Sequence, residues 1–208
     1  MAKSGILGLD ISSASTGWAY SDSEGNIKDF GVIKMTSKRH SERLAFFERE
    51  LKSIFKRFNP LYLGIEDIWN GRNAKTYKIL ALYHGVAYKV GFEKLKEDPV
   101  ILSESEIREK VGLAHNVKLE KTADKSKKEA VFDFLNTLLQ LNFNFKTHND
   151  ITDAIAVAMS TYLVISDEEK YGSLQDFRTC ARSKSRRSKK SVQKTGKKVS
   201  SRSKSRRP

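Results

Sequence analysis

The sequence predicts an α/β protein built on a mixed five-stranded sheet with helices on its faces. Three observations favour this class. Three short apolar segments joined by turn residues come first, and they predict an antiparallel meander. Strand-like and helix-like segments then alternate, which is the pattern of a sheet covered by helices. Apolar residues make up 38% of the 208 residues, which is enough for one buried core of ordinary domain size.

The strands are predicted from short apolar segments bounded by turn residues. The first segment is apolar up to an acid, Asp10, and the segment that follows Pro60 is apolar up to Glu66. Gly25 and Asn26 mark the turn between the second and third strands. The five predicted strands span residues 6–10, 17–20, 29–33, 61–66 and 99–102.

The helices are predicted from apolar residues that recur every three or four positions. Ser103 and Glu106 form a capping box for a short helix. Asn149 is expected to cap the last helix, which would place Asp150 and Asp153 in its first turn. The five predicted helices span residues 40–58, 74–92, about 104–111, 125–141 and 150–165, with a loop at 114–121.

The positive charge is concentrated at the end of the chain. Lys and Arg total 39 against 25 Asp and Glu, a net charge of +14. Residues 181–208 hold 13 of these bases, eight Ser and no acid, so residues 1–180 hold 26 bases and 25 acids, a net charge of +1. We therefore expect a folded domain at 1–168, a linker at 169–180 and a disordered basic tail that cannot bury a core.

Such a tail attracts polyanions, because Lys and Arg release counterions from phosphates. An import signal, an RNA-binding arm and an arm tuned by phosphorylation are the alternatives for the tail.

The single cysteine, Cys180, closes no disulfide within the chain and forms no thiolate cluster for zinc. No apolar run approaches the ~18–20 residues of a membrane span, and the N-terminus resembles no signal peptide. We expect an intracellular protein in a reducing compartment, cytoplasmic in a bacterium or phage, with nucleus or organelle as alternatives.

Four acids occupy positions that favour a single cluster. If the first and fourth strands are neighbours, Asp10 and Glu66 lie side by side at their ends. Asp150 and Asp153 are three positions apart and share one face of a helix. Close carboxylates repel one another unless hard cations neutralise them. Two Mg²⁺ about 3.5–4 Å apart, with Mn²⁺ as a substitute, suit oxygen ligands and support phosphodiester hydrolysis.

Each acid taken alone has a simpler explanation. Asp10 fits a turn, Glu66 fits a solvated strand end, and Asp150 with Asp153 fits a favourable interaction with the helix dipole. The joint pattern favours the cluster, because a nearly all-apolar segment follows Asp153 and a carboxylate there is expected to face protein.

The segments around these acids resemble the three acidic motifs of the RuvC-type Holliday junction resolvases, which belong to the ribonuclease H-like superfamily. The motifs are GLDISSASTGWA at 8–19, GIEDIW at 64–69 and NDITDAIA at 149–156. The resemblance covers about residues 5–165 in the family's order and spacing. It departs from the family where Ser12 and Ser13 replace the usual Pro-Gly, so the resemblance says nothing about that turn.

The resemblance implies a ribonuclease H-like fold and a homodimer that nicks two opposed strands of a four-way DNA junction, leaving 5′-phosphate ends. The residues from 74 to 92 resemble the family's dimer-forming helix. The resemblance also implies that the catalytic residues and ligands of two Mg²⁺ are Asp10, Glu66, Asp150 and Asp153.

Further residues are expected to contact DNA. Trp69 stands where the family carries an aromatic thought to wedge into the junction, and stacking on an unpaired base would contribute about 1–3 kcal/mol. A core Trp is the alternative. The bases expected to hold phosphates are Arg72, Lys118, Lys121, Lys125, Lys127 and Lys128, with Arg108 and Lys110 as weaker candidates. A solvated helix face is the alternative for these bases. His148 is expected to cap or pack and is left out of the ligand set.

Four functions each account for some of these features of the sequence. The first is a metal-dependent, structure-selective endonuclease that resolves four-way junctions. The second keeps the fold and chemistry but acts on flaps, replication forks or RNA-containing duplexes. The third, an ATP-binding protein of the actin and sugar-kinase type, fits the segment 10–16 but needs two such domains, for which 208 residues are too few. The fourth, a non-enzymatic basic DNA-binding protein, explains the tail and leaves the acids unexplained.

Overall fold

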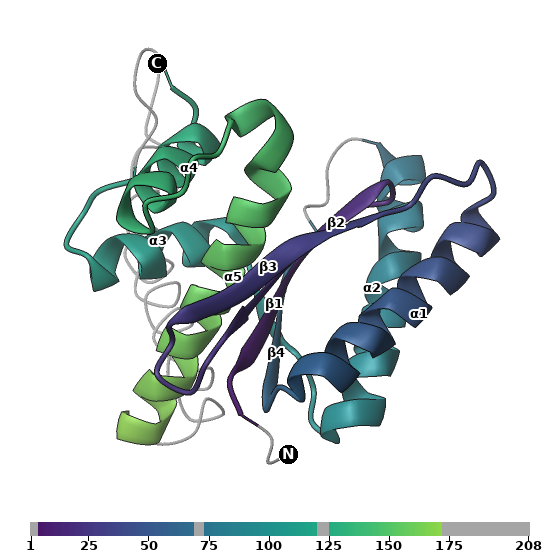
Figure 1. The fold of residues 1–208 in the computed structure, drawn as a ribbon, viewed down its shortest axis with the longest axis horizontal. Coiled ribbons are helices and arrows are strands. Elements are labelled where there is room, and N and C mark those ends of the chain that lie inside the picture. The colour runs from purple at the N-terminus through teal and green to yellow at the C-terminus, as the bar shows by residue number, and fades with distance from the viewer. Residues whose placement is uncertain (1–3, 69–72, 120–124, 172–208) are drawn as a thin grey trace, which may run out of the picture. The chain divides into compact units, whose positions relative to one another are not determined.

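A computed structural model describes residues 4–68, 73–119 and 125–171 of the protein (Figure 1). The elements follow the predicted order of three strands, two helix–strand pairs and three final helices. Residues 1–164 form one compact unit. The described part of the second unit, 165–208, is the C-terminal end of the last helix. The predicted division into domain, linker and tail therefore stays a prediction.

A five-stranded mixed sheet forms the centre of the first unit, as the sequence predicted. Its strand order is β3-β2-β1-β4-β5. The first three strands are antiparallel neighbours, whereas β4 runs parallel to β1 and β5 runs parallel to β4. The strands are β1 (Ile6–Ile11), β2 (Ser15–Ser21), β3 (Ile27–Lys34), β4 (Tyr62–Glu66) and β5 (Val100–Leu102).

Five helices cover the two faces of this sheet (Figure 1). Helices α1 (His40–Phe58) and α2 (Ala74–Leu95) lie on one face. The opposite face carries α3 (Glu104–Ala114), α4 (Lys127–Leu138) and α5 (Phe145–Tyr171). Within the described residues, no helix is both long enough and apolar enough to cross a membrane.

Alternate residues of the central strands face different surroundings, because side chains alternate across a sheet. Leu7 and Leu9 of β1 and Leu63 of β4 belong to the core that the sheet shares with α1 and α2, where Phe47 is fully buried. Each such side chain contributes about 1.5–3 kcal/mol by leaving water. Gly8 lies between Leu7 and Leu9 on the other side of β1, against Ala158 of α5, and Asp10 is on the same side of the strand as Gly8.

Glycines on this second face bring α5 close to the sheet. A Cβ on Gly8 would lie 2.5 Å from the Ala158 nitrogen, and a Cβ on Gly17 would lie 1.8 Å from the carbonyl oxygen of Asp150. Neither position has room for a side chain, and such glycines mark the close approach of another backbone. The two contacts, one on β1 and one on β2, fix the position of α5 and of the acids that it carries.

Helix α5 begins five residues earlier than predicted. The carbonyl of Asn144 accepts a hydrogen bond from the backbone N–H of His148 (3.0 Å), and the Asn144 side chain accepts one from the N–H of Lys146 (3.0 Å). Asn144 therefore starts the helix in place of Asn149. The prediction that Asp150 and Asp153 lie in the first turn is wrong, since Asp150 lies in the second turn and Asp153 in the third, both beyond the range of the helix dipole.

Other helix boundaries differ by a few residues from the prediction. Helix α4 begins at Lys127 because Ser126 and Glu129 form a capping box, whose hydrogen bond from the Glu129 N–H to the Ser126 hydroxyl measures 3.2 Å. Helix α2 continues to Leu95 and ends where Lys96 adopts a left-handed conformation. Both differences arise because the capping box and the left-handed residue decide where these helices begin and end, and the spacing of apolar residues does not predict either feature.

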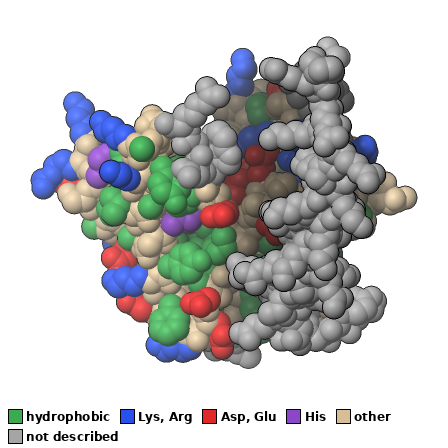
Figure 2. All heavy atoms as spheres, turned by 180° about the vertical axis from the view of Figure 1, so that it is seen from behind, with side chains coloured by type: hydrophobic (Ala, Val, Ile, Leu, Met, Phe, Trp, Pro, Cys, Tyr) green, Lys and Arg blue, Asp and Glu red, His purple; other side chains and the backbone are tan. Residues whose placement is uncertain are grey.

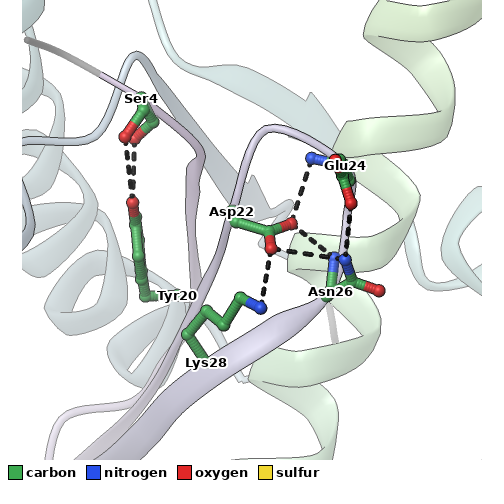
Figure 3. Close-up of polar contacts among 6 residues, drawn as sticks. All are labelled: Ser4, Tyr20, Asp22, Glu24, Asn26 and Lys28. Carbon is green, nitrogen blue, oxygen red and sulfur yellow. Dashed lines mark hydrogen bonds and ion pairs between the residues drawn. The ribbon is translucent and has the colours of Figure 1, made fainter.

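A hydrogen-bond network closes the turn between β2 and β3 (Figure 3). The Asp22 carboxylate accepts hydrogen bonds from the backbone N–H groups of Glu24 (3.0 Å) and Asn26 (2.9 Å) and pairs with Lys28 at 2.8 Å. The Lys28 contact, followed by these hydrogen bonds, lowers the pKa of Asp22 to about 2. The turn therefore helps to fix the register of β2.

Candidate active site

Three of the four predicted acids form a cluster where β1 and β4 end. Leu9 pairs with Ile65 in the parallel ladder, so the next residues, Asp10 and Glu66, stand on neighbouring strands at the same end of the sheet. Asp153 reaches this cluster from α5 and is only 9% exposed.

The raised pKa values of the three clustered acids indicate that too little positive charge surrounds them to neutralise their carboxylates. Burial, followed by the charges of Asp153 and Glu66, raises the pKa of Asp10 well above its ordinary value. Burial and the Asp153 charge raise the pKa of Glu66 to about 7. Burial also raises the pKa of Asp153, to about 6, although Lys128 acts against this rise. Carboxyls that disfavour one another's charged form are suited to binding a cation.

The fourth acid, Asp150, lies at the rim of the cluster. Its carboxylate accepts a hydrogen bond from the hydroxyl of Ser15, at the start of β2. Its charge raises the pKa of Asp10, but less than the other two acids do. The structure therefore brings three acids together and holds the fourth beside them through a neighbouring strand.

Lys128, in the first turn of α4, is a basic residue in contact with the cluster. Its ammonium forms an ion pair with Asp153. Burial lowers the pKa of Lys128, but Asp153, Asp10 and Glu66 outweigh this and raise the pKa above its ordinary value. Lys128 is therefore positively charged at neutral pH. Among the described residues, no three acids, His or Cys are already arranged around a cation position.

Two cavities open on either side of the carboxylates. A groove of about 510 Å³ starts at Asp10 and Glu66 and continues along α2 past Tyr77 and His84. Burial lowers the pKa of His84 to about 4, so its ring is neutral. A smaller cavity of about 140 Å³ lies against Glu66 and Asp153. Its basic lining residues are Arg108, Lys127 and Lys128. Figure 2 shows acidic side chains in a recess of this face with basic ones beside them.

The other predicted DNA contacts divide into two groups. Lys118 lines a separate groove beside the C-terminal half of α3, and Lys125 pairs with Asp133, so neither lines the two cavities at the carboxylates. Trp69, Arg72 and Lys121 lie outside the described residues.

Some residues at the site make contacts in the structure that were not predicted from the sequence. Arg108, a weaker candidate at first, is only 16% exposed in its side chain and pairs with Glu104 at 3.4 Å. The spacing of these two residues, four positions apart on a helix, is the sequence signal that could have indicated their contact. Neither Glu104 nor Ser15 was predicted from the sequence to belong to the site. His148 stacks on Phe143 with ring centroids 4.6 Å apart, in line with a packing role.

The chain is similar to a family of junction-cutting enzymes. Residues 6–161 match the family model described as Crossover junction endodeoxyribonuclease RuvC. The chain is 31% identical over 158 residues to the crossover junction endodeoxyribonuclease RuvC of Alkaliphilus oremlandii, covering 74% of this chain and 90% of that protein. It is 27% identical over 173 residues to that of Fusobacterium nucleatum, covering 80% and 84%.

Solved structures show the same fold. The structure of T. thermophilus RuvC in complex with Holliday junction substrate matches with a TM-score of 0.63 and 15% identity, over 78% of this chain and 95% of that chain. The yeast mitochondrial Holliday junction resolvase matches with a TM-score of 0.54 and 14% identity, over 81% and 82%. The predicted ribonuclease H-like fold is confirmed.

Proposed function

The chain belongs to the RuvC family of crossover junction endodeoxyribonucleases, and from this membership we propose that it resolves four-way DNA junctions by metal-dependent hydrolysis of phosphodiesters. The observation that carries the proposal is the meeting of Asp10, Glu66 and Asp153 from three separate elements. Such a cluster serves no purpose in a purely architectural DNA-binding protein, because it repels the phosphate backbone and costs stability.

The residues present fit divalent cations. The donors are carboxylate oxygens alone, which suit Mg²⁺ or Mn²⁺. Burial and mutual repulsion raise the pKa of Asp10 and Glu66, so a bound cation would relieve an unfavourable charge. We propose Asp10, Glu66, Asp150 and Asp153 as the residues that hold two Mg²⁺, with Mn²⁺ as a substitute. Mg²⁺ bound there would supply an activated water and stabilise the leaving 3′ oxygen, which leaves a 5′-phosphate end.

The basic residues around the smaller cavity position the scissile strand. Lys127 and Lys128 come from the first turn of α4 and Arg108 from α3, and all three line the cavity next to Glu66 and Asp153. Their charges hold phosphates without reading the bases. Arg108 brings a planar donor fork that fits phosphate oxygens, and Glu104 holds this fork in place.

A homodimer is proposed from the exposed face of α2. Tyr77, Leu82, Tyr88 and Phe92 lie along one side of this helix and are 39%, 54%, 39% and 54% exposed. Figure 2 shows hydrophobic side chains gathered on the side of the molecule where α2 lies. Pairing through this face would place two sites in one particle, which matches the near two-fold symmetry of a four-way junction.

The test is incubation of the full-length protein with a synthetic mobile four-way junction, with and without Mg²⁺. We expect paired nicks in Mg²⁺ and none in EDTA. Asp10→Asn should lower cleavage by about 10³-fold or more, since loss of metal stabilisation costs several kcal/mol, while junction binding persists. Full cleavage by Asp10→Asn would refute the proposed ligand role. Flaps, forks and linear duplex belong in the same panel, and equal cutting of linear duplex would refute junction selectivity.

A further inference from the structure

Ser15 links the turn after the first acid to the last acidic motif. It is the first residue of β2, and its hydroxyl donates a hydrogen bond to the carboxylate of Asp150, 135 residues further along the chain. Within the described part of the chain, Ser15 is the one donor whose hydrogen bond reaches this carboxylate. No spacing rule in the sequence predicts this contact.

The backbone of Ser15 is held firmly by Ser12. The Ser12 hydroxyl donates to the Ser15 carbonyl (2.6 Å) and accepts from the Ser15 N–H (3.1 Å), and the Ser12 N–H donates to the same carbonyl (3.1 Å). These hydrogen bonds give the turn a defined shape although it lacks the usual Pro-Gly. Ser15 is therefore a fixed point on the sheet from which a hydroxyl can orient another group.

Two residues further on, Gly17 contacts the backbone of the same acid. A Cβ there would meet the Asp150 carbonyl at 1.8 Å, so β2 and α5 touch at this point. Residues 15 and 17 point to the same side of β2. Gly17 thus sets how close the backbone of Asp150 comes, and Ser15 sets where its side chain points.

We propose that Ser15 is a positioning residue for the metal site: its hydroxyl holds one oxygen of Asp150 and leaves the other oxygen turned to a divalent cation. This rests on the proposed ligand role of Asp150. Groups that orient a metal ligand in this way affect metal affinity by about 10–100-fold. A neutral hydroxyl suits the role, because it orients the carboxylate without cancelling its charge.

Ser15→Val and Ser15→Thr provide the sharpest test, because the two side chains have the same shape and differ by the hydroxyl. Mn²⁺ binding to the full-length protein without DNA is measured by calorimetry. We expect Ser15→Val to bind Mn²⁺ about tenfold more weakly, and Ser15→Thr to bind it as the wild type does. Ser13→Ala, in the same turn and with no hydrogen bond from its side chain among the described residues, is the control and should bind normally.

A double-mutant cycle tests whether Ser15 acts through Asp150. In an Asp150→Ala background, Ser15→Val should cause no further loss of Mn²⁺ affinity. Equal Mn²⁺ affinity of Ser15→Val and the wild type, or a full additional loss in the Asp150→Ala background, would overturn the proposal. Junction cleavage is scored separately: a wild-type protein that binds Mn²⁺ but leaves junctions uncut contradicts the proposed function and leaves the role of Ser15 standing.

Discussion

Lys128 of α4 places its ammonium against the carboxylate of Asp153 on α5, so the acidic cluster contains a cation supplied by the protein itself. Asp10 and Glu66 also raise the pKa of this lysine. The ammonium contacts an oxygen that the proposed metal site needs. Lysine and a divalent cation should therefore compete for Asp153.

Lys128→Met tests this competition. Because the lysine side chain is 46% exposed but that of Asp153 is only 11% exposed, its loss should reduce the free energy of unfolding of the metal-free protein by about 1–3 kcal/mol. Mn²⁺ should bind severalfold more tightly, and cleavage should fall because the scissile phosphate loses a cation. Calorimetry and junction assays measure the two effects. Lys127→Met, one residue away, is the control for Mn²⁺ affinity, and an unchanged affinity in Lys128→Met would rule out competition.

The free energy of unfolding should depend on pH, because the folded protein disfavours the ionised form of Glu66. Its pKa rises from the ordinary 4.5 to about 7 on folding, so between these pH values the folded chain binds the proton that the unfolded chain has released. The free energy of unfolding then falls as pH rises through this window. Glu66→Gln removes the effect. In EDTA, this variant should match the wild type at pH 4 and exceed its stability at pH 8 by on the order of 2 kcal/mol.

Urea unfolding of both proteins across pH 4–8 measures this difference. The difference between the two proteins matters more than either curve, because His84, whose pKa is lowered to about 4, acts in the opposite direction between about pH 4 and its ordinary value of 6.5. A wild-type protein that is as stable as Glu66→Gln at pH 8 would show that the ionised Glu66 does not destabilise the folded protein.

Gly17→Ala should disturb the site without changing any of its chemical groups. The added methyl would stand 1.8 Å from the Asp150 carbonyl, so the start of α5 must shift. Overpacking of this kind costs about 1–3 kcal/mol. We expect a lower melting temperature, weaker Mn²⁺ binding and slower cleavage. Unchanged Mn²⁺ binding in a destabilised variant would mean that the contact supports the fold alone.

The exposed face of α2 predicts an assembly that sedimentation or light scattering can measure. Leu82→Glu introduces a charge on this face, where Leu82 is 54% exposed, and should convert a dimer to monomers. Leu138→Glu is the matched control, since this leucine is 39% exposed on α4. If both variants keep the mass of the wild type, α2 is not the pairing surface.

Removal of residues 181–208 should weaken junction binding and spare the chemistry. These residues carry 13 positive charges, and each phosphate contact adds about 0.9 to the slope of log affinity against log salt. The truncated chain should show a shallower salt dependence and retain metal-dependent nicking at low salt. Loss of nicking at saturating DNA would assign the tail a role beyond attraction.

The sequence predicted a mixed five-stranded sheet that begins with an antiparallel meander, and the five helices found among the described residues, because turns and apolar spacing are local signals. The sequence placed Asp10 beside Glu66 on the condition that the first and fourth strands are neighbours, and the parallel ladder of β1 with β4 meets that condition. It misplaced the start of α5, because two asparagines compete as the starting residue and the choice depends on tertiary packing. The edge-to-face contact of Phe132 with Phe145, 5.2 Å between centroids, supports the earlier start.

The contacts made by Ser15 and Lys128 were beyond sequence reasoning for a different reason. Ser15 meets Asp150 only because glycine brings β2 and α5 together. Lys128 was one of several lysines with equal claims, and its position at the start of α4 decides which of them contacts the acids. Such contacts depend on the relative placement of elements, which composition and periodicity do not encode.

Asp10 lies on β1, and the place of this strand in the sheet determines how readily this part of the protein opens. β1 is hydrogen-bonded to strands on both sides, whereas β3 and β5 are the edges of the sheet. Its amide protons should therefore be among the last to exchange with deuterium, at a rate set by global opening. Lys128 and Arg108 sit on helices outside the sheet, whose amides should exchange sooner. On warming, we expect the helices that carry Lys128 and Arg108 to open before β1 does. Binding of nucleic acid should therefore weaken while Asp10 is still held in position.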